Sequence, residues 1–127
     1  MTHRLLLDTH VVLWLLLGDR SAIPEPVVDH LTQPANTVLV SAVSVWEIAL
    51  KRSLGKLTIE DRWSHALDRL PFAPLPITAA HAAAVEKLPW HHRDPFDRLL
   101  VAQALVEEAT LVTADRTLEA YAVPTLW

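Results

Sequence analysis

Four acidic residues at widely separated positions of the 127-residue sequence could act together in catalysis. This four-acid group consists of Asp8, Glu47, Asp97 and Asp115. Carboxylates that lie close together raise one another's pKa values, and a divalent cation relieves the repulsion. Because every donor in the group is an oxygen, the hard cations Mg²⁺ and Mn²⁺ suit it best. Such a cation binds a phosphate oxygen and activates water for attack on phosphorus.

Three acidic residues also have an ordinary role as helix caps, and the sequence leaves both interpretations open. Asp8 and Asp115 each follow an apolar segment and precede a helical one, and aspartate is a favoured N-cap residue. Asp94 precedes Pro95, and proline is common at the first helical position. We therefore assign Asp94 mainly to capping, whereas Asp8 and Asp115 could cap, bind a cation or do both.

Glu47 and Asp97 have structural alternatives of a different kind. Ser44 and Glu47 have the Ser-x-x-Glu spacing of a capping box, which would direct the glutamate to the backbone. Asp97 lies in the first turn of its helix, where the helix dipole stabilises an anion. Apolar residues surround both positions, however, and a carboxylate near a core is costly unless it has a partner.

The elements that must position the four-acid group alternate between apolar strands and helices, and nine prolines punctuate them. This alternation predicts an α/β fold with a mostly parallel central sheet. Ligands of such folds bind beyond the carboxyl ends of the strands, so acids that follow strands should meet there. We expect strands or extended segments at 4–7, 37–40, 74–77, 110–113 and 124–127. We expect helices at 11–17, 26–31, 44–54, 61–70, 78–87, 95–109 and 115–121.

The composition excludes several other classes of protein. There is no cysteine, so disulfides, thiolate metal sites and a cysteine nucleophile are absent. The two glycines cannot build a dinucleotide-binding, Walker A or nucleophile-elbow motif, each of which needs clustered glycine. The apolar run at 4–17 is interrupted by Asp8 and is shorter than the roughly 20 residues of a membrane span. We therefore expect no targeting or membrane segment and a cytoplasmic location.

Four blocks of the sequence together resemble PIN-domain ribonucleases, and most closely the VapC-like toxins of bacterial type II toxin–antitoxin systems. The blocks are LLLDTHV at 5–11, SAVSVWEIA at 41–49, DPFDRLLVAQA at 94–104 and LVTAD at 111–115. The closing segment YAVPTLW at 121–127 is similar to that subgroup as well. The resemblance extends over essentially the whole chain, in order and at the spacing of the family.

This resemblance implies a single PIN domain over residues 1–127, with a three-layer α/β/α fold. It implies an endoribonuclease that depends on Mg²⁺ or Mn²⁺, is inhibited by a cognate antitoxin and often forms homodimers. Asp8, Glu47 and Asp97 would be the core metal-binding residues, and Asp115 a fourth, more variable acid. Thr9 and Thr113 would support the site with hydroxyl groups, and Asp94 belongs to the Asp-Pro-Phe-Asp form of the third block.

The net charge of −4 does not by itself indicate RNA binding. Without the four-acid group, however, eleven acidic residues remain against eleven basic ones. Some of the bases lie near the candidate acids and could contact phosphates, although they could equally be solvated residues on helix surfaces. The candidate phosphate contacts are Lys51, Arg52, Arg93 and Arg98. His10, His91 and His92 could contact RNA, or could be neutral surface histidines.

The tryptophans predict packing surfaces rather than chemistry. Five tryptophans in a short chain could stack on bases, but large aromatics more often fill a core or an interface. We expect Trp46 in the core, and Trp63 and Trp90 on a surface for an antitoxin or a second copy.

Two other classes compete with the nuclease hypothesis. A non-catalytic binding module on the same fold is disfavoured because all four acids are present. A receiver-type phosphoacceptor domain needs a paired acid after the first strand, where Thr9 follows Asp8. It also needs a lysine after a late strand, whereas Lys87 is the last lysine and precedes the 110–113 segment.

Overall fold

The computed structural model describes residues 2–127. Its centre is a five-stranded sheet. Its strands are β1 (Arg4–Leu7), β2 (Thr37–Ser41), β3 (Ala73–Leu75), β4 (Thr110–Val112) and β5 (Thr125–Leu126). They lie in the order β3-β2-β1-β4-β5, and each neighbouring pair is parallel. The predicted parallel sheet is thus confirmed. This order differs from the 2-1-3-4-5 order of receiver domains, so the phosphoacceptor alternative is wrong.

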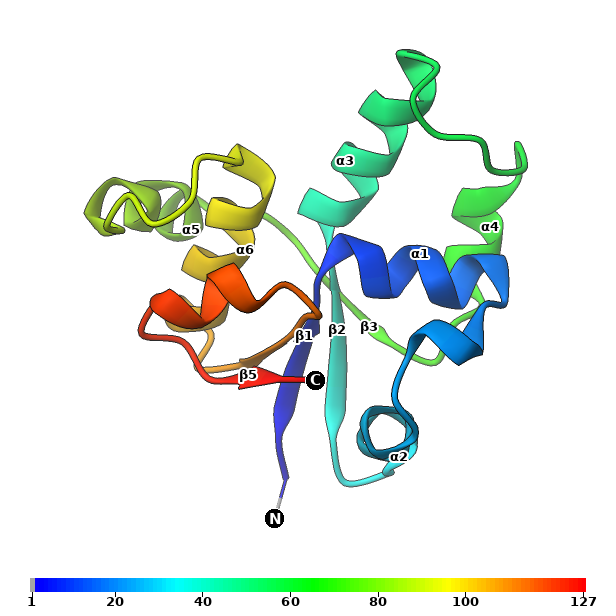
Figure 1. The fold of residues 1–127 in the computed structure, drawn as a ribbon, viewed down its shortest axis with the longest axis horizontal. Coiled ribbons are helices and arrows are strands. Elements are labelled where there is room, and N and C mark those ends of the chain that lie inside the picture. The colour runs from blue at the N-terminus through cyan, green and yellow to red at the C-terminus, as the bar shows by residue number, and fades with distance from the viewer. Residues whose placement is uncertain (1) are drawn as a thin grey trace.

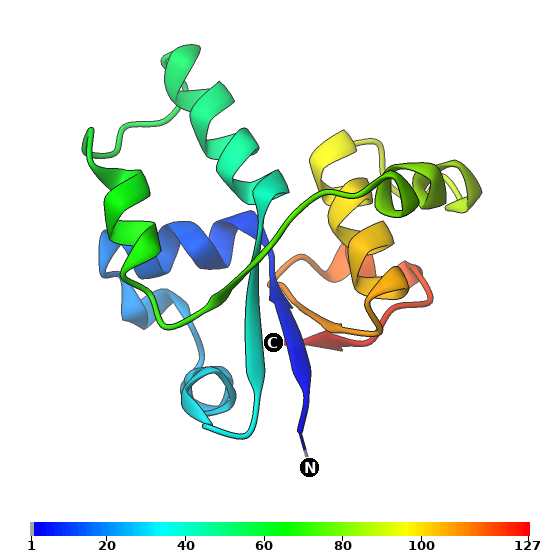
Figure 2. The same ribbon diagram turned by 180° about the vertical axis from the view of Figure 1, so that it is seen from behind.

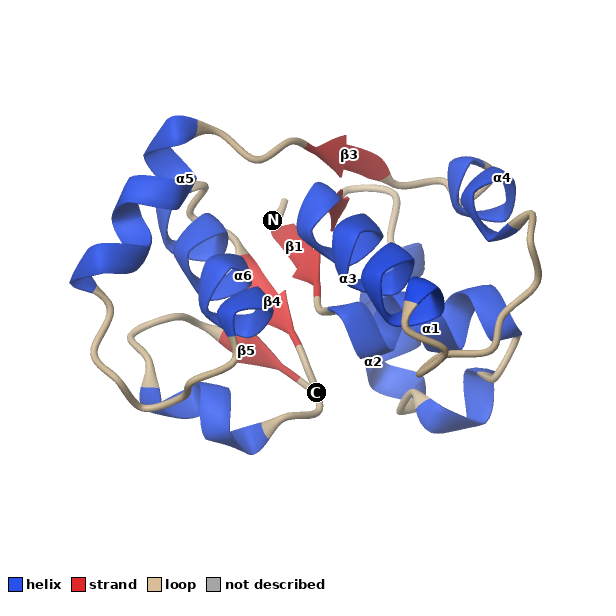
Figure 3. Ribbon diagram, turned by 90° about the horizontal axis from the view of Figure 1, so that it is seen from above, coloured by secondary structure: helices blue, strands red, loops and turns tan. Residues whose placement is uncertain are grey.

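Helices cover both faces of the sheet, which makes the three-layer α/β/α arrangement (Figures 1 and 2). The α-helices are α1 (Thr9–Leu17), α2 (Glu25–Thr32), α3 (Ala42–Ser53), α4 (Trp63–Asp68), α5 (Ala79–Ala84) and α6 (Pro95–Val106). The 3-10 helices are η1 (Arg20–Ala22), η2 (Val85–Lys87) and η3 (Arg116–Ala120). Seen from above, α1, α2 and α4 lie on one side and α5 and α6 on the other (Figure 3).

The core divides into two apolar clusters, one on each face of the sheet. Successive side chains of a strand point to opposite faces, so Leu5 and Leu7 join the cluster beneath α1 and α2. Leu6, between them, joins the cluster beneath α6. Because both faces are covered, the central residues of the strands are apolar rather than alternating with polar residues, as expected for a parallel sheet.

The junction between β1 and α1 is abrupt because Asp8 caps the helix directly. The Asp8 carboxylate accepts a hydrogen bond from the backbone N–H of Val11 at 3.2 Å. Helix α1 therefore begins at Thr9, two residues before the predicted start at Val11. It ends at Leu17, and the capping residue Gly18 has a φ of 70°, a left-handed conformation that suits glycine. The N-terminus of α1 thus places Asp8 at the carboxyl end of the sheet.

Helix α3 begins at Ala42 rather than Ser44, and this shift overturns the capping-box interpretation. The N-cap is Ser41, whose Oγ accepts a hydrogen bond from Val43 N at 2.9 Å. Ser44 is therefore inside the first turn and cannot cap the helix. Strand β2 runs straight into α3 without a loop, which is the physical reason for the earlier start.

Two tryptophan predictions are also wrong. Trp46 was expected in the core but is 50% exposed, because Ser44, Glu47 and Ile48 occupy the buried side of α3. Its ring packs on Phe96, with 4.6 Å between the ring centroids. Trp63 was expected on a partner surface but is 8% exposed and belongs to the core beneath α1. Trp90 is exposed, as predicted.

The other element boundaries differ from the prediction by a few residues. Helix α6 ends at Val106 instead of 109, because Glu108 adopts a left-handed φ of 52°. The segment predicted as one helix at 78–87 divides into α5 and η2. Within residues 2–127, none of the helices has the length and apolar character that crossing a bilayer requires.

Candidate active site

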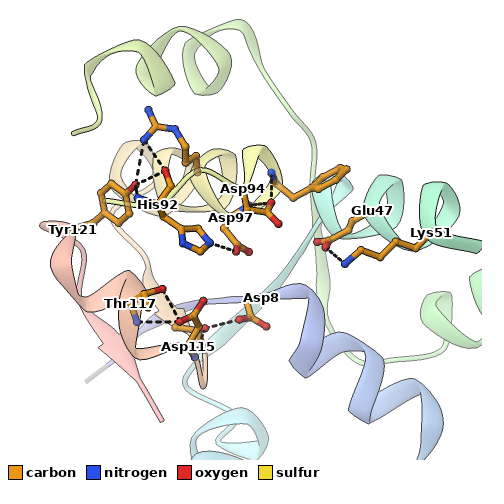
Figure 4. Close-up of polar contacts among 12 residues, drawn as sticks. Asp8, Glu47, Lys51, His92, Asp94, Asp97, Asp115, Thr117 and Tyr121 are labelled. Atoms are coloured by element: carbon orange, nitrogen blue, oxygen red, sulfur yellow. Dashed lines mark hydrogen bonds and ion pairs between the residues drawn. The ribbon is translucent and has the colours of Figure 1, made fainter. Parts of the chain in front are cut away.

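Three members of the four-acid group line one pocket at the carboxyl end of the sheet. Asp8 follows β1, Asp115 follows β4, and Asp97 lies in the first turn of α6. They share a pocket of about 280 Å³ with His10 and Trp14. Figure 4 shows the fourth member, Glu47, on α3 with its carboxylate directed toward Asp97. The fold therefore brings together acids that are more than 100 positions apart in the sequence.

Asp8 is buried and held by two donors. Thr113 Oγ1 donates to Asp8 Oδ2 at 2.5 Å, and Val11 N donates to Asp8 Oδ1 at 3.2 Å. Burial raises the pKa of Asp8, while the bonds from Thr113 and Val11 act in the opposite direction. Asp8 therefore does cap its helix through Oδ1, and it lines the pocket together with Asp97 and Asp115 (Figure 4).

Asp97 is paired with a histidine that the sequence did not single out as its partner. His92 Nε2 lies 2.8 Å from Asp97 Oδ2. Burial above all, together with the negative charges of Asp94 and Asp8, raises the pKa of Asp97 to about 6 despite the lowering effect of the His92 contact. Asp97 is thus poised to take up or release a proton in a mildly acidic range when no cation is bound.

Asp115 caps η3, and it forms a small cluster of potential metal ligands with His92 and Asp97. Its Oδ1 accepts bonds from Thr117 N at 3.0 Å and Thr117 Oγ1 at 2.7 Å. Partial burial acts to raise the pKa of Asp115, but the Thr117 bonds and nearby histidines outweigh it and lower the pKa. One ligand atom from each of His92, Asp97 and Asp115 lies within 4.8 Å of the others, which is compatible with a shared cation.

Glu47 provides a test of whether a cation fits here. It is 3% exposed, and its Oε2 accepts a bond from Lys51 Nζ at 2.7 Å, the i,i+4 pair that its sequence position allows. Its Oε1 is the one buried side-chain polar atom of residues 2–127 that has no hydrogen-bond partner. A buried oxygen without a partner costs free energy, and a cation in the neighbouring pocket would satisfy it. The donor set therefore fits a divalent cation.

The three predicted supporting residues have distinct structural roles. The Thr113 hydroxyl donates to Asp8 and accepts a bond from Asp115 N at 3.0 Å, so it joins two acids. Thr9 Oγ1 lies 3.0 Å from Ser44 Oγ, which ties α1 to α3 rather than touching a carboxylate. Asp94 caps α6 by accepting bonds from Phe96 N and Asp97 N, as the sequence indicated.

Three candidate phosphate contacts differ in how free their charged groups are. Arg93 is exposed on the loop before α6. Lys51 is partly exposed beside Glu47, and the hydrogen bond with Glu47 raises its pKa. Arg52 turns away toward Asp61 Oδ1 at 2.8 Å and the Ile59 carbonyl. Arg93 and Lys51 therefore have the better access to a ligand.

The fourth candidate, Arg98, is 2% exposed, so the prediction that it contacts phosphate is wrong. Its guanidinium donates to the backbone carbonyls of Val85, Leu88 and Pro89 and to the hydroxyl of Tyr121. Trp90 stacks over it, with 3.8 Å between Arg98 Cζ and the ring centroid. Arginine has five donors in a planar fork, which suits it to organise a loop from inside.

Arg98 and Tyr121 also fix the backbone of His92, which sequence reasoning missed. Tyr121 Oη accepts from His92 N at 3.0 Å, and Arg98 Nη1 lies 3.5 Å from the His92 carbonyl oxygen. The loop before α6 is thus held at the residue that contacts Asp97. The position of His92 five residues before Asp97, across the Asp94–Pro95 cap, is the one feature of the sequence that could have indicated this contact.

The family of the chain is established by a profile comparison. The PIN domain profile matches residues 5–124, and the chain belongs to the PIN domain family. This confirms the resemblance found in the four sequence blocks. A comparison with curated proteins gave no match.

Solved structures of similar fold include three VapBC complexes. VapBC2 from Rickettsia felis, bound to a DNA fragment from their promoter, has a TM-score of 0.74 at 15% identity, covering 97% of both chains. VapBC from Salmonella typhimurium, also bound to DNA, has a TM-score of 0.71 at 14% identity, covering 98% of this chain and 97% of that one. VapBC-1 from nontypeable Haemophilus influenzae has a TM-score of 0.69 at 16% identity, covering 97% and 96%. At these identities the likeness concerns the fold.

Proposed function

We propose that this PIN-domain protein is an endoribonuclease that depends on Mg²⁺ or Mn²⁺. The single observation that carries the proposal is the buried Glu47 Oε1, which has no partner among residues 2–127 and belongs to a carboxylate directed toward Asp97 (Figure 4). Carboxylates gathered in this way repel one another, and a bound cation relieves that repulsion. When bound, the cation supplies polarisation of the phosphodiester and activation of water.

The residues of the chain have separate tasks in this proposal. The four-acid group would hold the cation, Asp8 and Asp97 from opposite sides of the pocket. Thr113 and the N-terminus of α1 keep Asp8 oriented, and their hydrogen bonds favour its ionised form. Before a cation binds, His92 orients Asp97 through the contact between Nε2 and Oδ2. These contacts exist before any ligand arrives, so the site needs little rearrangement to bind one.

Substrate binding would rest on few basic groups. Arg93 and the partly exposed Lys51 are our candidates for phosphate contacts, while Arg52 would have to leave Asp61 to reach RNA. Because so few phosphates can be neutralised, we expect weak binding that falls as the salt concentration rises. The sequence of the RNA would then be selected by contacts other than charge.

We further propose that the protein is the toxin of a toxin–antitoxin pair, acts in the cytoplasm and forms a homodimer. The resemblance to VapC-like toxins supports this, as does the exposed apolar surface on α3 and the following loop. That surface contains Trp46, Leu50 and Leu54. Exposed apolar groups of this size commonly mark protein interfaces. Light scattering of the purified chain, alone and with a co-expressed antitoxin, measures both associations.

An RNA cleavage assay tests the nuclease proposal directly. The wild-type protein should cut structured RNA with Mg²⁺ or Mn²⁺ and stop on addition of EDTA. Asp97→Asn should lose at least about a hundredfold in rate, because it removes one ligand charge. Asp29→Asn, which changes an exposed acid on α2, should cut at the wild-type rate. Activity that resists EDTA, or that survives in Asp97→Asn, would contradict the proposal.

The same variants test the one alternative that remains, a non-catalytic binding module, and also the toxin assignment. A non-catalytic binding module would bind RNA without cutting it under any metal condition. A toxin should arrest growth when expressed alone, and Asp97→Asn should relieve the arrest at an equal protein level. Growth of cells that contain active wild-type protein would contradict the toxin assignment while leaving the nuclease assignment intact.

A further inference from the structure

We propose that His92 is a nitrogen ligand of the divalent cation, together with Asp97 and Asp115, so that the site prefers Mn²⁺ to Mg²⁺. The inference rests on the proposed function, since it concerns the cation that the nuclease would use. It departs from the expectation of a purely oxygen site, because it adds a donor of different chemistry. Imidazole nitrogen suits transition metals better than it suits Mg²⁺.

The first support is the spacing of the three donors. Their ligand atoms lie within 4.8 Å of one another, and His92 Nε2 is 2.8 Å from Asp97 Oδ2. Donors that share an octahedral cation at about 2.1 Å are separated by about 3.0 Å when adjacent and about 4.2 Å when opposite. The pair of His92 and Asp97 is thus close to the spacing of adjacent ligands, and small side-chain rotations would bring Asp115 within range.

The second support is the way the protein holds His92. Tyr121 accepts from its backbone N–H, and Arg98 reaches its carbonyl oxygen from the interior. Burying an arginine so that it donates to loop carbonyls costs free energy, because its charge is removed from water. We take this cost as a sign that the loop must hold the His92 ring in a fixed position. Residues that orient a metal-binding histidine are a regular feature of metal sites.

The third support is the buried acid on the other side of the site. Glu47 is 3% exposed, and its carboxylate, whose Oε1 has no partner among residues 2–127, is directed toward Asp97 from α3 (Figure 4). It offers oxygen to a cation that lies near Asp97, whereas His92 and Asp115 approach from the opposite side. The site therefore combines oxygen ligands from β1, β4, α3 and α6 with nitrogen from the loop before α6.

His10 is the main competitor for the nitrogen position, and the experiment must separate the two rings. It is exposed and lines the same pocket as Asp8, Asp97 and Asp115. Its ring lies against Trp14, with 6.1 Å between the centroids, and it makes no hydrogen bond with an acid of the pocket. His92 already contacts Asp97, so the geometry favours His92.

Pulsed electron paramagnetic resonance of the Mn²⁺-loaded full-length protein tests the inference without reference to activity. A nitrogen bound to Mn²⁺ modulates the electron spin echo, and ¹⁵N-labelled histidine changes that modulation in a known way. We expect nitrogen modulation in the wild type and in His10→Gln, and its loss in His92→Gln. In calorimetry, His92→Gln should also lose about tenfold in Mn²⁺ affinity and less in Mg²⁺ affinity.

The outcomes separate this inference from the proposed function. Tight Mn²⁺ binding without nitrogen modulation in the wild type overturns the inference and leaves the nuclease proposal standing. Loss of the modulation in His10→Gln instead of His92→Gln also overturns it. Failure of the wild type to bind Mn²⁺ or Mg²⁺ contradicts both proposals. If circular dichroism shows that His92→Gln is unfolded, persistence of the modulation in both His10→Gln and His91→Gln assigns it to His92.

Discussion

Thr113 Oγ1 donates a hydrogen bond of 2.5 Å to Asp8 Oδ2, although the two residues are 105 positions apart in the sequence. The same hydroxyl accepts a bond from Asp115 N, so a single side chain links the acid that follows β1 to the acid that follows β4. These strands are neighbours in the sheet, which brings their carboxyl ends together. The position of Asp8 in the pocket thus depends on a residue that is not itself charged.

Thr113→Val should weaken the site at Asp8, because valine has the same shape but no hydroxyl. The buried carboxylate would lose a donor, and we expect the free energy of unfolding at neutral pH to fall by about 1–3 kcal/mol. Chemical denaturation measures this loss. Thr58→Val, at an exposed position, serves as the control and should change stability by less than about 0.5 kcal/mol. Equal effects in the two variants would show that the bond to Asp8 contributes nothing specific.

Asp97→Asn should become increasingly stabilising as the pH rises in the absence of metal. The pKa of Asp97 is raised from 3.8 to about 6 in the folded protein, so between these values the folded state holds a proton that the unfolded chain has released. The stability that this proton contributes is complete below about pH 4 and lost as the pH rises through about 6. We expect the advantage of the variant to grow by about 2–3 kcal/mol between pH 4 and pH 7.

Denaturation of both proteins in EDTA across this pH range checks the Asp97 prediction. Asp29→Asn again provides the control, and its difference from the wild type should stay nearly constant with pH. A difference for Asp97→Asn that is flat, or that shrinks as the pH rises, would show that Asp97 is not held in an unfavourable environment. Addition of Mg²⁺ should stabilise the wild type more than Asp97→Asn, since the cation binds the ionised carboxylate.

Lys51→Met should make the protein more dependent on a bound cation. Lys51 supplies the positive charge that compensates the buried carboxylate of Glu47. Because the lysine is partly exposed, we expect a loss of only about 1–2 kcal/mol in EDTA. Saturating Mg²⁺ should restore more stability to Lys51→Met than it adds to the wild type. Thermal unfolding with and without Mg²⁺ measures this, and the exposed Lys56→Met is the matched control. An identical response to Mg²⁺ in all three proteins would refute the prediction.

Arg98→Lys should destabilise the fold although it conserves the charge. A lysine ammonium cannot serve the carbonyls of Val85, Leu88 and Pro89 together with the Tyr121 hydroxyl. We expect a loss of about 2–4 kcal/mol in the free energy of unfolding, measured by chemical denaturation. Arg93→Lys, on the exposed loop nearby, should be within about 0.5 kcal/mol of the wild type. A stable Arg98→Lys would mean that the loop orders itself without the guanidinium.

Much of the candidate site was predictable because it follows from local rules. The apolar strand before Asp8, the Asp94–Pro95 helix start and the strand before Asp115 each carry information within a few residues. The alternation of strands and helices then places those acids at one edge of a parallel sheet. The predictions that failed concern contacts across the fold. Arg98 is buried by a loop and a tyrosine that come from other parts of the chain, and no local pattern reports their positions.

Helix α3 shows the same contrast between what local patterns predict and what contacts across the fold decide. Its residues predict a helix, but the packing of α3 against α1 and α6 decides which of its side chains are buried. This packing leaves Trp46 outward and turns Glu47 inward. Neither hydrophobicity nor helix propensity could decide this, since tryptophan is the more apolar of the two residues.

The amino-acid sequence alone determined the α/β class, the identity of the four acids and the oxygen-rich chemistry they offer, because residue type and short-range spacing suffice for these. Only the tertiary structure decided the partners of two acids, Thr113 for Asp8 and His92 for Asp97, whereas the i,i+4 spacing of Glu47 and Lys51 already indicated their pair. For Asp8 that partner directly follows a different strand, β4, and packing alone determines its distance. The ionisation of each acid and its readiness to bind a cation depend on such distances, and this is why the three-dimensional arrangement was needed to describe the site.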